Sequence, residues 1–215
     1  MSFSILPALI PDIGPVYDAY FAAFSADPAS RHLLDIFFPD GFESEEFRKA
    51  HTDGTAAYWQ TCQTQYTYKC VDRASGKIVG MALFDVFVLP RTSEQRAFPE
   101  LSWLQGEQRE RADKTLKPLW EAREKLWGGR PHIYVHAFAV DPKQQGRGAG
   151  AALVQSLIKL GNDCQLPIYL EATPRSAALY KKMGFQTFPH DQARVVTEDG
   201  VDIPLMVKQP LTHRL

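Results

Sequence analysis

One stretch constrains this chain most: an apolar segment that leads through closely spaced glycines into a helix. Residues 133–140 are β-branched, aromatic or small apart from His136, a composition that predicts a buried strand. Asp141 and Pro142 end the strand, and residues 145–150 contain three glycines. Apolar residues then recur at helical spacing as far as Leu160, which predicts a helix with one buried face. The expected arrangement is strand, glycine turn and helix N-terminus.

The glycine turn has the chemistry of an anion-binding site. Glycines allow the backbone to approach a ligand closely, and the first N–H groups of a helix have no partner within the helix. Together with the helix dipole, these groups favour a phosphate or pyrophosphate. The dinucleotide fingerprint needs G-x-G-x-x-G and the P-loop ends in Gly-Lys-Ser/Thr, so neither fits. Gln145, Gly148 and Gly150 form the pattern Q-x-x-G-x-G. A surface turn before an ordinary helix is the structural alternative.

This stretch resembles the GNAT superfamily of acyl-CoA-dependent N-acyltransferases, and locally its arylalkylamine N-acetyltransferase branch. In that family the turn holds the pyrophosphate of coenzyme A. The resemblance implies acetyl-CoA as co-substrate and an α/β GNAT fold, a mixed, mostly antiparallel sheet with helices on both faces. It assigns acetyl-CoA binding to Phe138, Ala139, Val140, Gln145, Gly146, Arg147, Gly148, Ala149, Gly150, Ser176 and Tyr180.

Composition indicates a globular protein and gives no sign of a nucleic-acid, membrane or metal partner. The 215 residues are 45% hydrophobic and 23% charged, as in globular proteins, and the net charge of −1 gives no reason to expect nucleic acid or an anionic membrane as partner. No apolar run approaches the ~20 residues of a membrane span. The 3 cysteines have no metal-ligand spacing, which indicates a reducing compartment and no metal site. With no signal-peptide pattern, we expect a cytoplasmic protein; the oligomeric state is not indicated.

Hydrophobic periodicity predicts a single domain over residues 1–215 with a helical insertion at 90–130. Within the insertion, Glu precedes Lys or Arg at i,i+4 spacing, which favours one or two helices. Residues 29–42 are expected to form a short apolar segment and turn. Strands are expected at 3–6, 65–71, 77–89, 133–140, 166–172, 185–188 and 201–208, and helices at 12–28, 44–62, 150–160 and 175–183. This order of elements matches the GNAT fold.

Acyl transfer to an amine requires the amine to lose a proton and favours protonation of the departing thiolate. Tyr180 is the candidate donor, because residues 177–185 resemble the family's Leu-Tyr-x-x-x-Gly-Phe segment, where the tyrosine hydroxyl donates to the sulfur. A phenol of pKa ~10 suits that transfer. Packing on a short helix is the alternative. Where the family often has an asparagine, this chain has Thr173, which can cap a helix beginning at Pro174.

His136 is the candidate base. It shares one face of the predicted strand with Tyr134, Phe138 and Val140, and an imidazole can accept a proton at neutral pH. The arylalkylamine branch has a catalytic histidine at the matching place and a second histidine two residues earlier. The earlier position here is Tyr134, so a two-histidine relay is in doubt. A core histidine with satisfied hydrogen bonds is the alternative.

Glu171 is the candidate substrate-binding residue. It is the only charged residue of the predicted strand 166–172, and a carboxylate is seldom buried without a partner. It should therefore face a cavity, a cation or the substrate amine. A structural carboxylate paired within the protein is the alternative.

These residues lead to one functional expectation and two rivals. The expectation is direct transfer of an acetyl group from acetyl-CoA to the primary amine of a small molecule. His136 or Glu171 would take the amine proton and Tyr180 would give one to the thiolate. The rivals are acetylation of a protein lysine or N-terminus, and a non-catalytic acyl-CoA-binding module. The sequence does not identify the acceptor.

Overall fold

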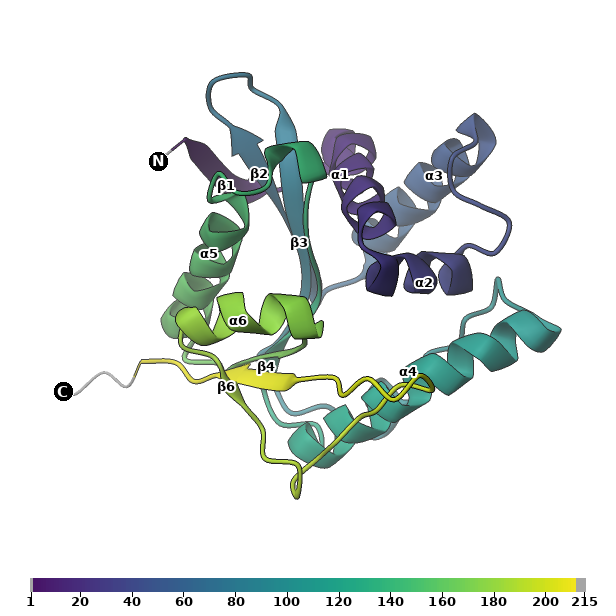
Figure 1. The fold of residues 1–215 in the computed structure, drawn as a ribbon, viewed down its shortest axis with the longest axis vertical. Coiled ribbons are helices and arrows are strands. Elements are labelled where there is room, and N and C mark those ends of the chain that lie inside the picture. The colour runs from purple at the N-terminus through teal and green to yellow at the C-terminus, as the bar shows by residue number, and fades with distance from the viewer. Residues whose placement is uncertain (1, 212–215) are drawn as a thin grey trace. The chain divides into compact units, whose positions relative to one another are not determined.

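A mixed, mostly antiparallel sheet runs through the chain, with strands in the order β1-β2-β3-β4-β5-β7-β6. The structure is a computed structural model that describes residues 2–211 (Figure 1). The chain forms two compact units: residues up to Asp85 with His136–Leu157, and Val86–Val135 with the residues from Ile158 onward. The strands are β1 (Phe3–Pro7), β2 (Gln65–Asp72), β3 (Ile78–Phe87), β4 (His132–Val140), β5 (Ile168–Glu171), β6 (Gln186–Thr187) and β7 (Leu205–Lys208). The α-helices are α1 (Ile13–Ala26), α2 (Pro28–Phe37), α3 (Glu45–Thr61), α4 (Gly106–Trp127), α5 (Ala149–Cys164) and α6 (Pro174–Lys182).

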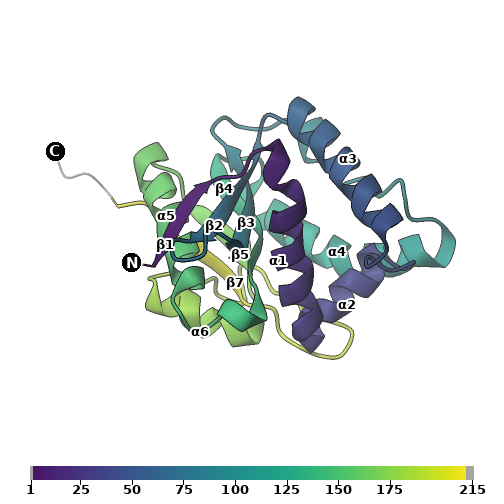
Figure 2. The same cartoon turned by 90° about the horizontal axis from the view of Figure 1, so that it is seen from above.

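In the first unit, two helices cover opposite faces of β4. Strands β1, β2 and β3 are antiparallel neighbours. Val16 of α1 packs against Met81, Ala137 and Ala139, and α1 runs beside β3 (Figure 2). Gly150 of α5 lies against the Val140 side chain on the other face, since alternate residues of a strand point to opposite sides. The expected covering of both sheet faces by helices is confirmed here.

One element differs from the sequence-based expectation. Residues 28–37 form helix α2 rather than an irregular apolar segment. Pro28 ends one helix, as expected, but it also occupies the first position of the next, where its missing N–H costs nothing. The Asp27 carboxylate caps the new helix by accepting from the Ser30 N–H at 3.2 Å. An aromatic cluster centred on Phe21 and Phe42, stacked 4.9 Å apart, then buries Leu34 of α2.

In the second unit, helix α4 packs on a sheet formed by β4, β5, β7 and β6. The first half of β4 is parallel to β5, which is antiparallel to β7, and β6 pairs with β7. Ala122, Leu126 and Trp127 of α4 share a buried cluster with Tyr169 and Leu205. The predicted insertion is therefore one long helix whose C-terminal part belongs to the core of its unit. No helix within residues 2–211 is long and apolar enough to cross a membrane.

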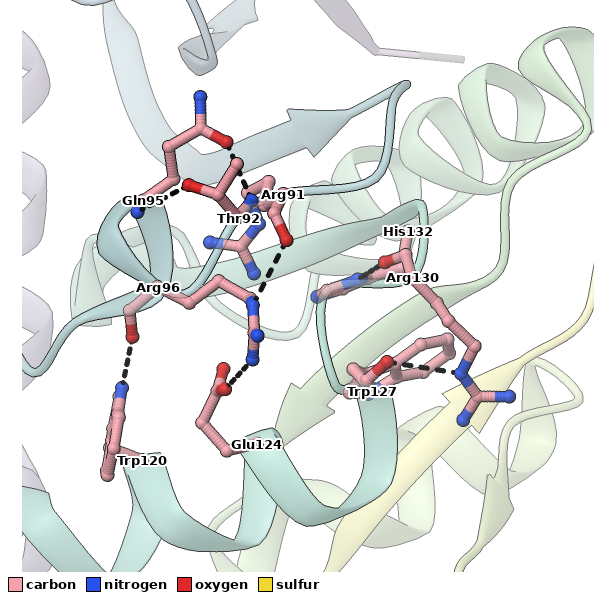
Figure 3. A network of polar contacts seen from close by, with 9 residues as sticks. All are labelled: Arg91, Thr92, Gln95, Arg96, Trp120, Glu124, Trp127, Arg130 and His132. Carbon is pink, nitrogen blue, oxygen red and sulfur yellow. Dashed lines mark hydrogen bonds and ion pairs between the residues drawn. The ribbon is translucent and has the colours of Figure 1, made fainter.

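A polar network joins the C-terminal part of α4 to the segments before and after the helix (Figure 3). The Arg96 guanidinium pairs with Glu124, and Trp120 Nε1 donates to the Arg96 carbonyl oxygen at 2.9 Å. His132 is fully buried, stacks on Trp127 with ring centroids 4.4 Å apart, and places Nδ1 2.7 Å from the Arg130 carbonyl oxygen. These contacts connect helix α4 to the segment that follows β3 and to the start of β4.

Candidate functional site

The glycine turn before α5 is open in front of its backbone. Gly146 and Gly148 have φ of +74° and +93°, a region that side chains rarely adopt. A Cβ added at either position would meet no heavy atom within 4 Å. The glycines are thus required by the shape of the turn and not by packing against protein. Helix α5 begins directly afterwards, at Ala149, so its first N–H groups lie at the turn.

Side chains of the turn and its neighbours hold this shape. The Asp141 carboxylate accepts from the Lys143 N–H at 2.9 Å, and Gln145 Nε2 donates to the Val140 carbonyl oxygen at 3.1 Å. Arg147 Nη2 donates to Asp72 Oδ2 at 3.2 Å. The Ala74 N–H and the Arg147 guanidinium lower the pKa of the Asp72 carboxyl. Gln145 and Arg147, both predicted to bind acetyl-CoA, are therefore placed where they brace the turn.

The end of β4 leads directly into this turn. Ala139 is buried, and Phe138 and Val140 are half-buried. A Cβ at Gly80 of β3 would lie 2.7 Å from the Ala139 carbonyl oxygen, so the close approach of these two backbones requires glycine. The Asp141 N–H also donates to the Val79 carbonyl oxygen at 2.9 Å. The main chain at Phe138–Val140 is therefore rigidly placed in the same unit as the glycine turn.

His136 forms a chain of hydrogen bonds with two side chains of the first unit. His136 Nε2 lies 2.7 Å from Asp85 Oδ2, and Thr64 Oγ1 donates to Asp85 Oδ1 at 2.9 Å. The His136 side chain is 32% exposed and that of Asp85 is 13% exposed. The imidazole therefore reaches solvent while its carboxylate partner lies beneath the surface.

Sequence reasoning did not find Asp85, although a signal was present. Asp85 is the only charged residue in β3, which is otherwise apolar apart from its glycine. A carboxylate in such a strand needs a partner. The same argument singled out Glu171 and would have singled out Asp85.

Glu171 lies in a buried cluster of the second unit. Its Oε2 accepts from the Tyr134 hydroxyl at 3.0 Å, and Arg123 Nη1 of α4 lies 4.0 Å from its Oε1. The Arg123 guanidinium also lies over the Tyr134 ring, 4.1 Å from its centroid. Burial, and then the neighbouring Glu171 carboxylate, raise the pKa of Tyr134. This is the environment expected of a paired structural carboxylate, and a role in binding the amine stays a prediction.

Tyr180 lies on α6 of the second unit and is also buried. Burial raises the pKa of its hydroxyl to about 12, against a smaller opposing effect of a hydrogen bond with Ser176. The helix starts as expected, since Thr173 Oγ1 accepts from the Ser176 N–H at 3.3 Å and Pro174 occupies the first turn. Ser176, predicted to bind acetyl-CoA, thus donates its N–H to the helix cap and forms a hydrogen bond with Tyr180.

The predicted site residues fall into two sets. The first unit brings together the glycine turn, Phe138–Val140 and His136, and the second holds Glu171, Ser176 and Tyr180. Among residues 2–211, no group of three or more His, Cys, Asp or Glu side chains is placed to hold a metal ion. The first set combines an open glycine turn at a helix N-terminus with a histidine–carboxylate pair.

Comparisons with known proteins identify the family and the fold. A family model described as "Acetyltransferase (GNAT) family" matches residues 30–185. A probable acyltransferase of Ajellomyces capsulatus, SID5, is 31% identical over 122 residues, which is 54% of this chain and 82% of that protein. An uncharacterized N-acetyltransferase of Schizosaccharomyces pombe is 30% identical over 82 residues, and the match spans only 34% of its length.

Solved structures share the fold at low sequence identity. A crystal structure from Corynebacterium glutamicum, described as histone acetyltransferase HPA2 and related acetyltransferase, superimposes with a TM-score of 0.61 at 23% identity over 100% of both chains. A crystal structure described as mosquito arylalkylamine N-acetyltransferase like 5b superimposes with a TM-score of 0.59 at 16% identity. The match covers 97% of this chain and 100% of the other. At these identities the likeness concerns the fold alone.

Proposed function

Because the chain belongs to the acetyltransferase (GNAT) family, we propose that it transfers an acetyl group from acetyl-CoA to the primary amine of a small molecule. The observation that carries the proposal is the open glycine turn at the start of α5, in the same unit as the His136–Asp85 pair. One part suits a pyrophosphate and the other suits removal of a proton.

Acetyl-CoA binding is proposed for the turn and the strand before it. The N–H groups of Gly146–Gly150 would meet the pyrophosphate, and the space beside Gly146 and Gly148 gives room for it. The main chain of Phe138–Val140 would bind the pantetheine arm and the thioester carbonyl. Gln145 and Arg147 would act by keeping the turn in shape.

Two proton carriers complete the proposed reaction. The amine nitrogen attacks the thioester carbonyl carbon while His136 takes the amine proton. The carbon–sulfur bond then breaks, and the Tyr180 hydroxyl donates to the departing sulfur. The raised pKa keeps Tyr180 protonated throughout the neutral range, so the donor is always present there. The proton that His136 gains balances the one that the thiol carries away.

The test of the proposed function is thiol release from acetyl-CoA with a panel of acceptors. The panel contains arylalkylamines, polyamines, amino acids and lysine peptides. We expect release to depend on a small primary amine and to yield the acetylated amine by mass spectrometry. Release with peptides alone would contradict the small-molecule acceptor, and binding of acetyl-CoA without release with any acceptor would contradict the enzyme.

A second test addresses the turn itself. At a hundred times its Kd, acetyl-CoA should stabilise the fold by about 2.7 kcal/mol. Gly148→Asp adds a negative charge where the pyrophosphate would lie, so this variant should lose most of that gain in thermal unfolding. Gly148→Ala is the matched control, because it imposes the same positive φ on a side chain without the charge. Equal stabilisation of Gly148→Asp and wild type would contradict the assignment.

A further inference from the structure

A chain of three hydrogen-bonded side chains joins three separate segments of the chain: Thr64, Asp85 and His136. Thr64 precedes β2, Asp85 lies on β3 and His136 on β4. Each carboxylate oxygen of Asp85 has its own partner, His136 Nε2 at 2.7 Å and Thr64 Oγ1 at 2.9 Å. Because both oxygens are held, the carboxylate has a defined orientation toward the imidazole.

The chemistry of this chain determines which nitrogen of His136 bears hydrogen. An ionised carboxylate only accepts hydrogen bonds, so the bond to Asp85 Oδ2 requires a hydrogen on Nε2. A neutral imidazole carries one ring hydrogen, and Nδ1 is then the basic nitrogen. We propose that Asp85 is a positioning residue that fixes His136 in this form, so that Nδ1 takes the proton of the acceptor amine. The inference rests on the proposed role of His136 as base.

The same pair favours the protonated product of that step. When Nδ1 gains the amine proton, His136 becomes a cation whose Nε2–H already donates to a carboxylate. A hydrogen bond between two charged groups is roughly twice as strong as one between neutral groups. The Asp85 side chain is 13% exposed, so water screens this bond little. Asp85 thus supports proton uptake by His136 without touching the substrate.

Helix α3 and the residue that follows it contribute other titratable groups beside this chain. Tyr58 lies near enough to Asp85 for the carboxylate to add to the rise in its pKa, although burial is the main cause. Cys62 Sγ lies 3.8 Å from Thr64 Oγ1. Burial raises the pKa of the Cys62 thiol, but hydrogen bonds, first among them one with Tyr58, outweigh it, so that the pKa is lowered. The pH at which the profile changes therefore does not identify the group responsible. That group is identified by substituting Asp85 and His136.

The test is the tautomer of His136 in the full chain, read by NMR with ¹⁵N-labelled histidine. In wild type, we expect the neutral imidazole to carry its hydrogen on Nε2. Asp85→Asn keeps the shape of the side chain, but its amide can donate to Nε2 and so move the hydrogen to Nδ1. We expect this variant to change tautomer and to lower kcat by about 10²-fold or more, with KM for acetyl-CoA little changed.

Three further variants guard against a fold defect in Asp85→Asn. Thr64→Val removes the hydroxyl that orients Asp85 and should lower kcat less, while Thr64→Ser restores the hydroxyl and the rate. Asp53→Asn makes the same chemical change at an exposed carboxylate of α3, paired with Lys49, and should alter neither tautomer nor rate. A wild-type imidazole with its hydrogen on Nδ1, or Asp85→Asn with wild-type tautomer and rate, would overturn the proposal.

The two readouts also separate this inference from the proposed function. The tautomer is read without substrate, so it supports or overturns the role of Asp85 whatever the acceptor assay shows. Absence of thiol release with every amine overturns the function. A wild-type rate in His136→Ala would overturn the base assignment, and with it the catalytic role of Asp85.

Discussion

Asp85 and Glu171 are each the only charged residue of an otherwise apolar strand, one in each unit of the chain. Asp85 accepts a hydrogen bond from an imidazole that is 32% exposed. Glu171 is 10% exposed and pairs with Arg123, whose own side chain is 17% exposed. An imidazole gains and loses a proton near neutral pH, whereas a guanidinium keeps its charge at every relevant pH. A buried carboxylate can therefore support proton transfer when its partner is an imidazole, but not when its partner is a guanidinium.

The largest expected effect comes from breaking the pair in which the carboxylate faces a histidine. His136→Ala should lower kcat/KM by about 10²–10⁴-fold, because a general base contributes that much. Any limb of the pH profile that His136 itself produces should disappear, with acetyl-CoA binding little changed. The measurement is kcat/KM against pH with acceptors of different basicity, since the amine itself can produce such a limb. A limb that survives in His136→Ala would leave His136 as a structural residue.

The second effect concerns the pair in which the carboxylate faces an arginine. Glu171→Ala leaves the buried Arg123 guanidinium without its carboxylate, which should lower the free energy of unfolding by about 3–5 kcal/mol. Catalysis per folded molecule should change little. Urea unfolding gives the first quantity and steady-state kinetics the second. A higher KM for the amine at unchanged stability would instead identify Glu171 as the predicted amine-binding residue.

The smallest effect tests whether Tyr180 is the proton donor proposed for the departing thiolate. Tyr180→Phe keeps the ring and removes only the donor, so kcat should fall by about 10²-fold with substrate binding preserved. A buried phenol with a pKa of about 12 loses its proton only as the pH rises through that value. Tyr180 should therefore produce no descending limb between pH 6 and 10 in wild type. An unchanged kcat in Tyr180→Phe would leave it a packing residue.

Much of the fold could be predicted because local sequence patterns determine it. The alternation in β4, the glycines before α5 and the Thr173 cap of α6 each depend on residues close together in the chain. Helix α2 was missed because proline was interpreted as a stop. Its start depends on Asp27 as cap with Pro28 in the first turn, a pattern that ends one helix and begins another.

The candidate site was less predictable because its partners are distant in sequence. Asp85 and His136 are 51 residues apart, and no local pattern brings them within hydrogen-bond distance. Arg123 lies in a densely charged helix, where nothing distinguishes it from the other cations until its contact with Glu171 is known. Periodicity assigns a residue to a strand face, but the identity of its partner requires the tertiary structure.

The positive φ at Gly146 and Gly148 affects how mutations in related chains should be interpreted. A side chain at either position is strained even though space is available, so folding alone selects against replacement. A relative that had lost its enzymatic activity would keep both glycines. No backbone constraint of this kind applies to Asp85 in its regular strand. Retention of both glycines is therefore no evidence that a relative is active, and on the proposed mechanism the residue at position 85 is the better indicator of turnover.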